Sequence, residues 1–167
     1  MCTKQFFSLC LILSSVFLSG CGPEMPPGFP KVYPVSLTVT QGDQPLAGAT
    51  VSLRPTDLSI GDWAIGGKTD ENGVVELLTH GYRGAPAGTF KVVVTKTVME
   101  GTDARDEAMQ RGDIAAAQRV QLRLWSYVRE EYGNLERTPL EVEITKETRT
   151  LSVDAGPAIR TALQVPL

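Results

Sequence analysis

Few side chains in this sequence belong to the types that carry out acid–base, nucleophilic or metal chemistry. His80 is the only histidine among 167 residues, and the three cysteines all lie within the first 21 positions. A catalytic zinc site of the carboxypeptidase type needs two histidines and a glutamate, so one histidine cannot supply it. We find no nucleophile and base in the pattern that covalent catalysis requires. The sequence therefore predicts a protein that is not an enzyme and holds no metal or cofactor, with His80 on a surface loop.

Acidic residues gather in one part of the chain and suggest a calcium site, at Asp103, Asp106, Glu107 and Asp113. Calcium takes six to eight oxygen ligands from a shaped loop, and the spacing is not that of an EF-hand. Arg105 and Arg111 interleave with the acids. A solvated charged face is the better interpretation.

Aromatic residues that could stack on a sugar or a peptide occur at Trp125, Tyr127 and Tyr132, with Trp63 in another loop. Aromatic side chains are enriched in binding surfaces. Packing beneath a long loop is the simpler explanation, and both interpretations stay open.

The first 20 residues have the organisation of an export signal. Lys4 is followed by an apolar run from Phe6 to Leu18, which is shorter than the roughly 20 residues that a membrane-spanning helix needs. Leu18-Ser19-Gly20-Cys21 resembles the lipobox of bacterial lipoproteins. In that family the peptide is cut before the cysteine, which then carries acyl chains. The resemblance implies a signal peptide over residues 1–20 and lipidation of Cys21.

After such a cut, Cys21 would be the one remaining cysteine, so no intramolecular disulfide could form. Residues 21–30 are rich in proline and glycine, which favours an extended, semi-rigid tether. Acyl chains would anchor the exported chain to a bacterial membrane, on the periplasmic or cell-surface side. Gly22 is not the aspartate that accompanies inner-membrane retention in some bacteria, which favours the outer membrane. The net charge of -3 and the lack of a dense basic run argue against a nucleic-acid partner.

Short runs of alternating apolar and polar residues follow the tether and are typical of half-buried strands. They lie at residues 33–40, 49–53, 65–69, 74–78, 89–96, 140–144 and 151–153. Asn72-Gly73 indicates a tight hairpin turn between paired strands, because Asn-Gly tolerates positive φ. Strands with one polar face, not alternating regularly with helices, predict an all-β fold. We expect an antiparallel, seven-stranded β-sandwich.

Residues 98–127 interrupt the strand pattern. The stretches 103–110 and 113–124 are rich in Ala, Gln, Arg and acids, which favours helix, and Asp113 could cap the second. Arg119 to Trp125 also alternates as a strand would, but the run Ala115-Ala116-Ala117 makes helix the preferred interpretation. We therefore expect a partly helical insertion, and a C-terminal tail over residues 156–167.

Three segments resemble the carboxypeptidase regulatory-like domain, a transthyretin-like (prealbumin-like) β-sandwich. They run from Gly42 to Leu53, from Lys68 to Leu77 and from Ala87 to Val94. A narrower resemblance, to a group of small lipoproteins common in Planctomycetes, rests on Pro30 to Val35, Tyr132-Gly133-Asn134 and Thr138-Pro139-Leu140. The resemblance implies one such domain over residues 31–155, without the catalytic domain of the metallocarboxypeptidases.

Together these features indicate a membrane-anchored lipoprotein whose non-catalytic β-sandwich has a binding or structural role at the cell envelope, with a protein or glycan partner. The alternative is an accessory or carrier subunit of an envelope export or enzyme complex. An accessory subunit should co-purify with one stoichiometric partner after mild crosslinking.

We expect Cys21→Ser to block lipid attachment, because serine lacks the thiol that is acylated. The precursor should stay uncut by the lipoprotein peptidase and leave the membrane fraction or accumulate misprocessed. Fractionation and mass spectrometry of the full chain test this. A normal mass and normal membrane partition of the variant would show that Cys21 is not the anchor.

Overall fold

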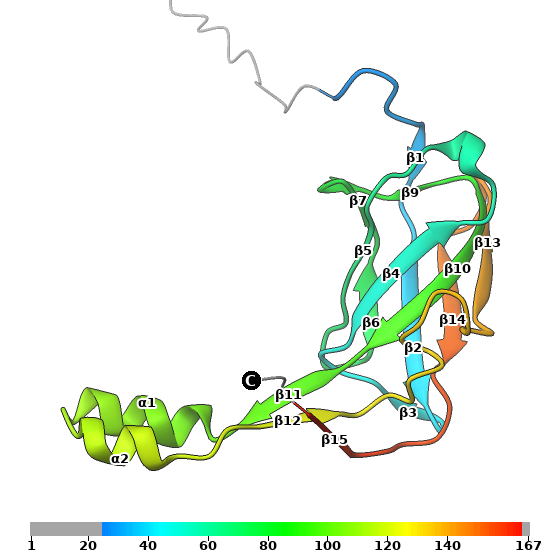
Figure 1. Ribbon diagram of the computed structural model, residues 1–167. Helices are drawn as coiled ribbons and strands as arrows, with labels where there is room; N and C mark the ends of the chain where they lie inside the picture. Colours follow the sequence, from blue (N-terminus) through cyan, green and yellow to red (C-terminus); the bar gives the residue numbers. More distant parts are fainter. Residues whose placement is uncertain (1–24, 165–167) are drawn as a thin grey trace, which may run out of the picture.

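The computed structural model describes residues 25–164, and the predicted signal peptide and Cys21 lie outside the described residues. None of the helices in this range is long and apolar enough to cross a bilayer. The strands form a sandwich, and two short helices project from one end of it (Figure 1).

Two sheets form the body of the sandwich. The first is six-stranded, in the order β13 (Glu141–Ile144), β10 (Gly88–Thr95), β4 (Thr50–Pro55), β5 (Ile65–Lys68), β7 (Leu78–Thr79) and β8 (Tyr82–Arg83). The second contains β14 (Thr150–Asp154), β2 (Ser36–Gln41), β3 (Gln44–Pro45) and β6 (Val74–Glu76). A short ladder joins β1 (Val32–Tyr33) to β9 (Ala85–Pro86). The predicted all-β sandwich is confirmed, with one parallel pair, β14 with β2, among antiparallel ones.

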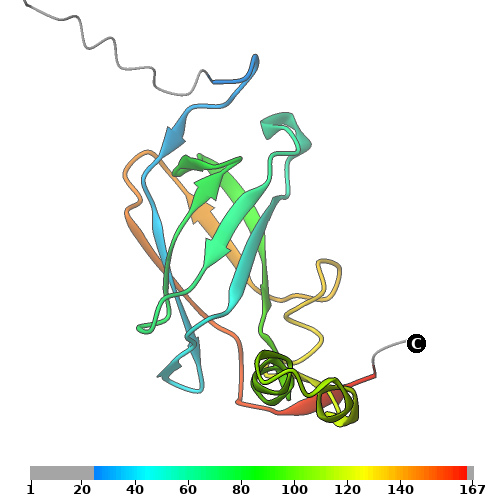
Figure 2. The same cartoon turned by 90° about the vertical axis from the view of Figure 1, so that its left-hand side faces the viewer.

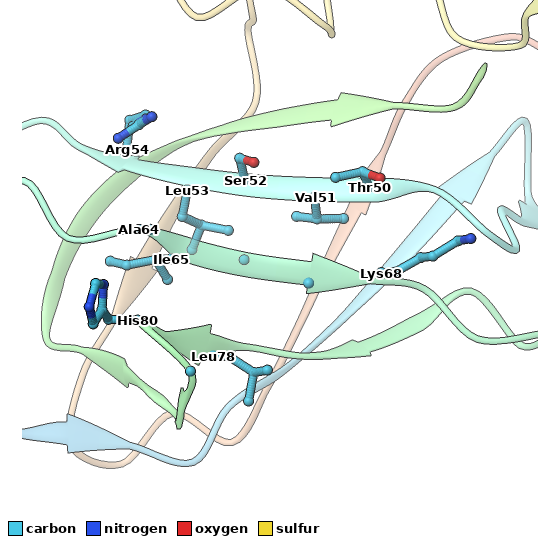
Figure 3. Close-up of a pocket in the computed structure, with 13 residues that line it drawn as sticks. Thr50, Val51, Ser52, Leu53, Arg54, Ala64, Ile65, Lys68, Leu78 and His80 are labelled. Carbon is cyan, nitrogen blue, oxygen red and sulfur yellow. The ribbon is translucent and has the colours of Figure 1, made fainter. Parts of the chain in front are cut away.

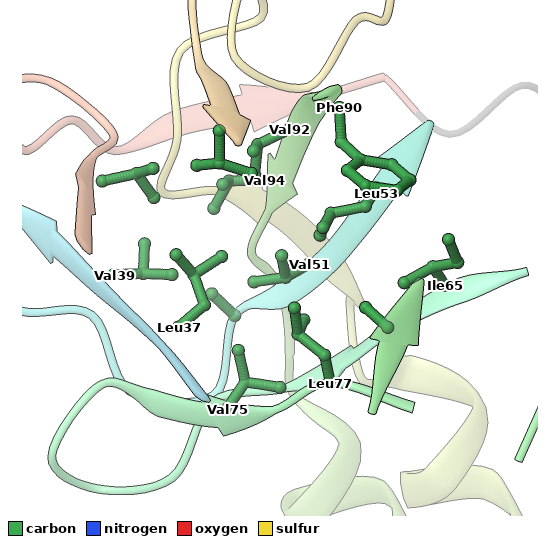
Figure 4. Close-up of a cluster of buried hydrophobic side chains, with 14 of the residues drawn as sticks. Leu37, Val39, Val51, Leu53, Ile65, Val75, Leu77, Phe90, Val92 and Val94 are labelled. Carbon is green, nitrogen blue, oxygen red and sulfur yellow. The ribbon is translucent and has the colours of Figure 1, made fainter. Parts of the chain in front are cut away.

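The core lies between these sheets and is built from alternate positions of their strands (Figure 4). The apolar residues predicted to point inward on three strands are all buried, namely Val35, Leu37 and Val39, Ala49, Val51 and Leu53, and Phe90, Val92 and Val94. Each of these three strands thus has one face in the core and one directed away from it, which is the arrangement that the period-two pattern predicts.

The turn at Asp70–Val74 is tight, as predicted, but it does not join paired strands. The Asp70 carboxylate accepts hydrogen bonds from the backbone N–H groups of Asn72 (2.9 Å) and Val74 (2.8 Å), and Gly73 has φ 73°. However, β5 belongs to the six-stranded sheet, whereas β6 pairs with β2 in the other sheet. The turn therefore arches across the core, and the prediction of a hairpin was wrong in its pairing.

The predicted strand 74–78 is also divided between the sheets. β6 pairs with β2, and β7 pairs with β5. Fully buried Leu77 lies between them and donates its N–H to the carbonyl of Val35 at 3.0 Å. One short segment thus contributes to both layers.

The insertion forms an arm, made of β11 (Thr97–Glu100), α1 (Thr102–Gln110), α2 (Ile114–Arg119), β12 (Arg123–Ser126) and, from the C-terminal tail, β15 (Thr161–Leu163). Both helices are confirmed, as is the cap, because the Asp113 side chain accepts from the N–H of Ala116 at 2.9 Å. The helix predicted over 120–124 was wrong, since this part of the chain leads into β12. β15 was not predicted at all.

The arm leaves the sandwich at the end opposite to residues 25–31, as both views show (Figures 1 and 2). It is a three-stranded sheet in the order β11-β12-β15, with the helical hairpin at its tip. β11 follows β10 almost directly, so the arm extends the longest strand of the sandwich.

We expect Gly73→Val to destabilise the sandwich by about 2 kcal/mol or more, because β-branched residues avoid positive φ. A Cβ at Gly73 would also lie only 2.6 Å from the Val39 carbonyl oxygen. Glu71→Ala, a change of an exposed residue in the same turn, should leave stability within about 0.5 kcal/mol. Thermal melting of both variants checks this, and equal melting temperatures would contradict it.

Candidate functional site

A shallow groove of about 360 Å³ crosses the outer face of β4, β5 and β7 (Figure 3). Gly66 leaves it open, because Gly66 carries no side chain between Ser52 and Leu78. Arg54 and His80 lie toward one end and Lys68 at the other. Ligand sites generally place a few polar groups so that they converge on the ligand. These polar groups lie far apart along the groove, so it offers little beyond an open surface.

His80 is in a tight turn between β7 and β8, with φ 49° and an exposed side chain. Its ring lies edge-on to Trp63, with centroids 6.0 Å apart. The position on a surface loop is as predicted. Within residues 25–164, no three His, Cys, Asp or Glu side chains gather as a metal site would require.

The acidic residues of the insertion are engaged locally. Glu107 pairs with Arg111 at 3.5 Å, one helical turn apart, and Asp106 lies 3.8 Å from Arg105. Asp113 caps α2. These contacts fit the charged, solvated face predicted from the sequence.

The aromatic residues considered as a platform are separated in the structure. Tyr132 and Trp63 both pack against the core, and Trp63 also lies beside Phe29 near the N-terminal end of the described chain. Trp125 is on the arm, and Tyr127 follows β12, donating its N–H to the carbonyl of Lys96 at 2.9 Å. These aromatic residues therefore do not form one shared platform.

The arm's two faces differ because successive residues of a strand point to opposite sides. On one face, the Glu100 carboxylate accepts a hydrogen bond from Trp125 Nε1 at 2.8 Å and also pairs with Arg160. The Arg160 guanidinium lies 4.1 Å from the centroid of the Trp125 ring. This Glu–Trp–Arg contact ties together β11, β12 and the segment before β15, and it covers the indole with a cation.

The other face of the arm carries an apolar row. Met99, Leu124 and Leu163 lie directly opposite one another on β11, β12 and β15. Met99 is 44% exposed and Leu163 40%. Since β11 and β15 each have β12 as their one neighbour in the described chain, both outer edges of this small sheet are open. Apolar side chains beside open strand edges are features of a protein-binding surface.

The helical tip adds two further exposed apolar side chains, Met109 and Ile114. The buried residues of α1 and α2 are Ala108 and Ala117, and neither belongs to the sandwich core. Small alanines at these positions allow the two helices to approach closely. The tip is thus held to the arm and not to the sandwich.

Part of this surface could be predicted from the sequence. The alternation from Arg119 to Trp125 was visible and would have identified β12. Arg160 and Leu163 were missed, since a strand of three exposed residues has no hydrophobic pattern to detect.

No family model and no curated protein matches this chain. Among solved structures, it is similar to a crystal structure of a variant of BcpA, the major pilin subunit of Bacillus cereus, with 18% sequence identity and a TM-score of 0.37. The match covers 75% of this chain and 29% of the pilin chain. The assignment of the fold therefore depends on the two sheets observed in this chain. The resemblance to small lipoproteins remains a prediction.

We expect the sandwich to fold without the helical tip. Replacing residues 102–120 with a short Gly/Ser linker should change the free energy of unfolding by less than about 1 kcal/mol, because loop closure depends weakly on length. Leu53→Ala, at a fully buried core position, should cost about 2–5 kcal/mol. Chemical denaturation of both variants measures the difference. Failure of the tip deletion to fold would show that the helices support the core.

Proposed function

We propose that this chain is a lipoprotein, anchored through Cys21, whose non-catalytic β-sandwich holds the arm away from the envelope membrane to bind a protein partner. The observation that carries the proposal is the placement of the two ends. Residues 25–31 enter the sandwich at one end, and the arm leaves at the other (Figures 1 and 2). A membrane anchor ahead of residue 25 would therefore direct the arm outward.

The arm supports a protein partner better than a glycan. A glycan-binding platform needs an open aromatic face, and Arg160 covers the ring of Trp125. The row of Met99, Leu124 and Leu163 instead offers flexible apolar side chains, which suit protein surfaces. A segment of the partner could also add a strand at the edge of β11 or β15.

A photo-crosslinking amino acid at position 99 tests the surface in cells that express the full chain. Position 98 is the matched control, because Val98 is similarly exposed at 39% but lies on the opposite face of the same strand. We expect one defined crosslinked product from position 99 and none from position 98. Equal products from both positions, or none from either, would contradict the proposal.

Two substitutions then measure the contribution of the row once the crosslinked partner is identified. Met99→Gln should weaken binding about tenfold, since burial of one apolar side chain at an interface contributes on the order of 1–2 kcal/mol. Val98→Gln should change binding less than about twofold. A partner recovered in fixed stoichiometry from the membrane would favour the accessory-subunit alternative over an adhesion or structural role.

A further inference from the structure

An aromatic cluster fixes the chain where it enters the sandwich. The Phe29 ring lies 5.2 Å from Trp63 and 4.9 Å from Tyr82, measured between centroids. The N–H of Phe29 also bonds the carbonyl of Pro26 at 3.1 Å, which closes a turn. The predicted tether over residues 21–30 is therefore not extended throughout, because its last part is docked on the domain.

The docking of Phe29 limits the distance between the domain and an anchor at Cys21. Residues 22–28 lie between these two positions. Eight residue steps span at most about 28 Å when fully extended, and the turn before Phe29 shortens this reach. The end of the sandwich that holds the cluster must then stay close to any membrane that holds Cys21.

This end, which we call the tether pole, also exposes aliphatic side chains. Leu58, in the short helix η1 (Leu58–Ile60), is 79% exposed, and Met25 is 59% exposed. Ile60 of the same helix packs against the core, so the helix is fixed while Leu58 projects. The tether pole comprises Met25, Phe29, Leu58, Trp63, His80 and Tyr82.

The charges near the tether pole nearly balance. Arg54 pairs with Asp62 at 2.9 Å. Asp57 accepts a hydrogen bond from the N–H of Ser59 at 2.9 Å, which lowers the pKa of its carboxyl. Lys31 lies 5.5 Å from the ring of Tyr33. These residues do not form a basic patch that would select anionic lipid. Contact with a lipid surface would therefore depend on apolar and aromatic groups.

We propose that the tether pole is a lipid-contact surface, which rests against the phospholipid that holds Cys21 and keeps the arm pointing away from it. Tryptophan and tyrosine favour the headgroup level of a bilayer, and leucine and methionine favour the acyl region just below. A few such side chains bind weakly alone, but a short tether keeps them at high local concentration near the surface. This inference rests on the proposed anchoring, which it extends.

The two tryptophans provide the test, since Trp63 belongs to the tether pole and Trp125 to the arm. The processed full-length protein, purified from membranes, is reconstituted into phosphatidylcholine vesicles with brominated acyl chains, which quench nearby indoles. With Trp63 as the one emitter (Trp125→Phe), we expect at least a twofold loss of fluorescence relative to unbrominated vesicles. With Trp125 as the one emitter (Trp63→Phe), we expect a loss below about a tenth.

A second pair of variants keeps Trp63 and its aromatic neighbours unchanged. In the Trp125→Phe background, Leu58→Gln should reduce the quenching of Trp63 at least twofold, whereas Leu163→Gln on the arm should leave it unchanged. Protein that floats with the vesicles but shows no preferential quenching of Trp63 overturns this inference and leaves the anchoring intact. Protein that does not float with the vesicles overturns both.

Discussion

Phe90, Val92 and Val94 occupy alternate positions of β10 and are fully removed from solvent between the two sheets. β10 pairs with β4 on one side and β13 on the other, so the largest sheet is assembled around it. Burial of three large apolar side chains contributes several kcal/mol of transfer free energy. Beyond Thr95 the chain continues almost directly into β11. The same strand therefore organises the core and sets the direction in which the arm leaves it.

The sandwich could be predicted because its physical constraint is local and periodic. Leu37, Val39, Val51 and Leu53 face one core, and that requirement appears in the sequence as alternation. The Asp70 turn was also readable, since an Asx turn depends on residues within four positions. The strand with which the segment after the turn pairs could not be predicted. Whether the strand after Gly73 pairs with β5 or crosses to β2 depends on packing between distant segments, which turn chemistry does not encode.

The candidate surface on the arm was harder to predict for a related reason. β11 and β15 consist entirely of exposed residues, so no burial pattern distinguishes them from loops. They are held by backbone pairing with β12 and by the contact of Glu100 with Trp125 and Arg160, across 25 and 60 positions of sequence. The alanine run at 115–117 correctly indicated helix, but the helix was predicted to continue to Leu124, whereas it ends at Arg119 and Arg123 and Leu124 pair with β11. Local helix propensity therefore determines the secondary structure of the helical tip, whereas pairing between distant segments determines that of the arm's strands.

Open edges on a small apolar sheet would ordinarily invite uncontrolled pairing between copies of a chain. Short edge strands and charged residues reduce that risk. β11 has four residues and β15 three, and Glu100 and Arg160 place a fixed ion pair on the face opposite the apolar row. Such an edge is too short for extended cross-β stacking, yet it leaves backbone groups and Met99 and Leu163 accessible to a segment of matching length. The Glu–Trp–Arg contact and the backbone pairing with β12 tie the arm's strands together without a buried core, so the opposite face of the arm can remain apolar.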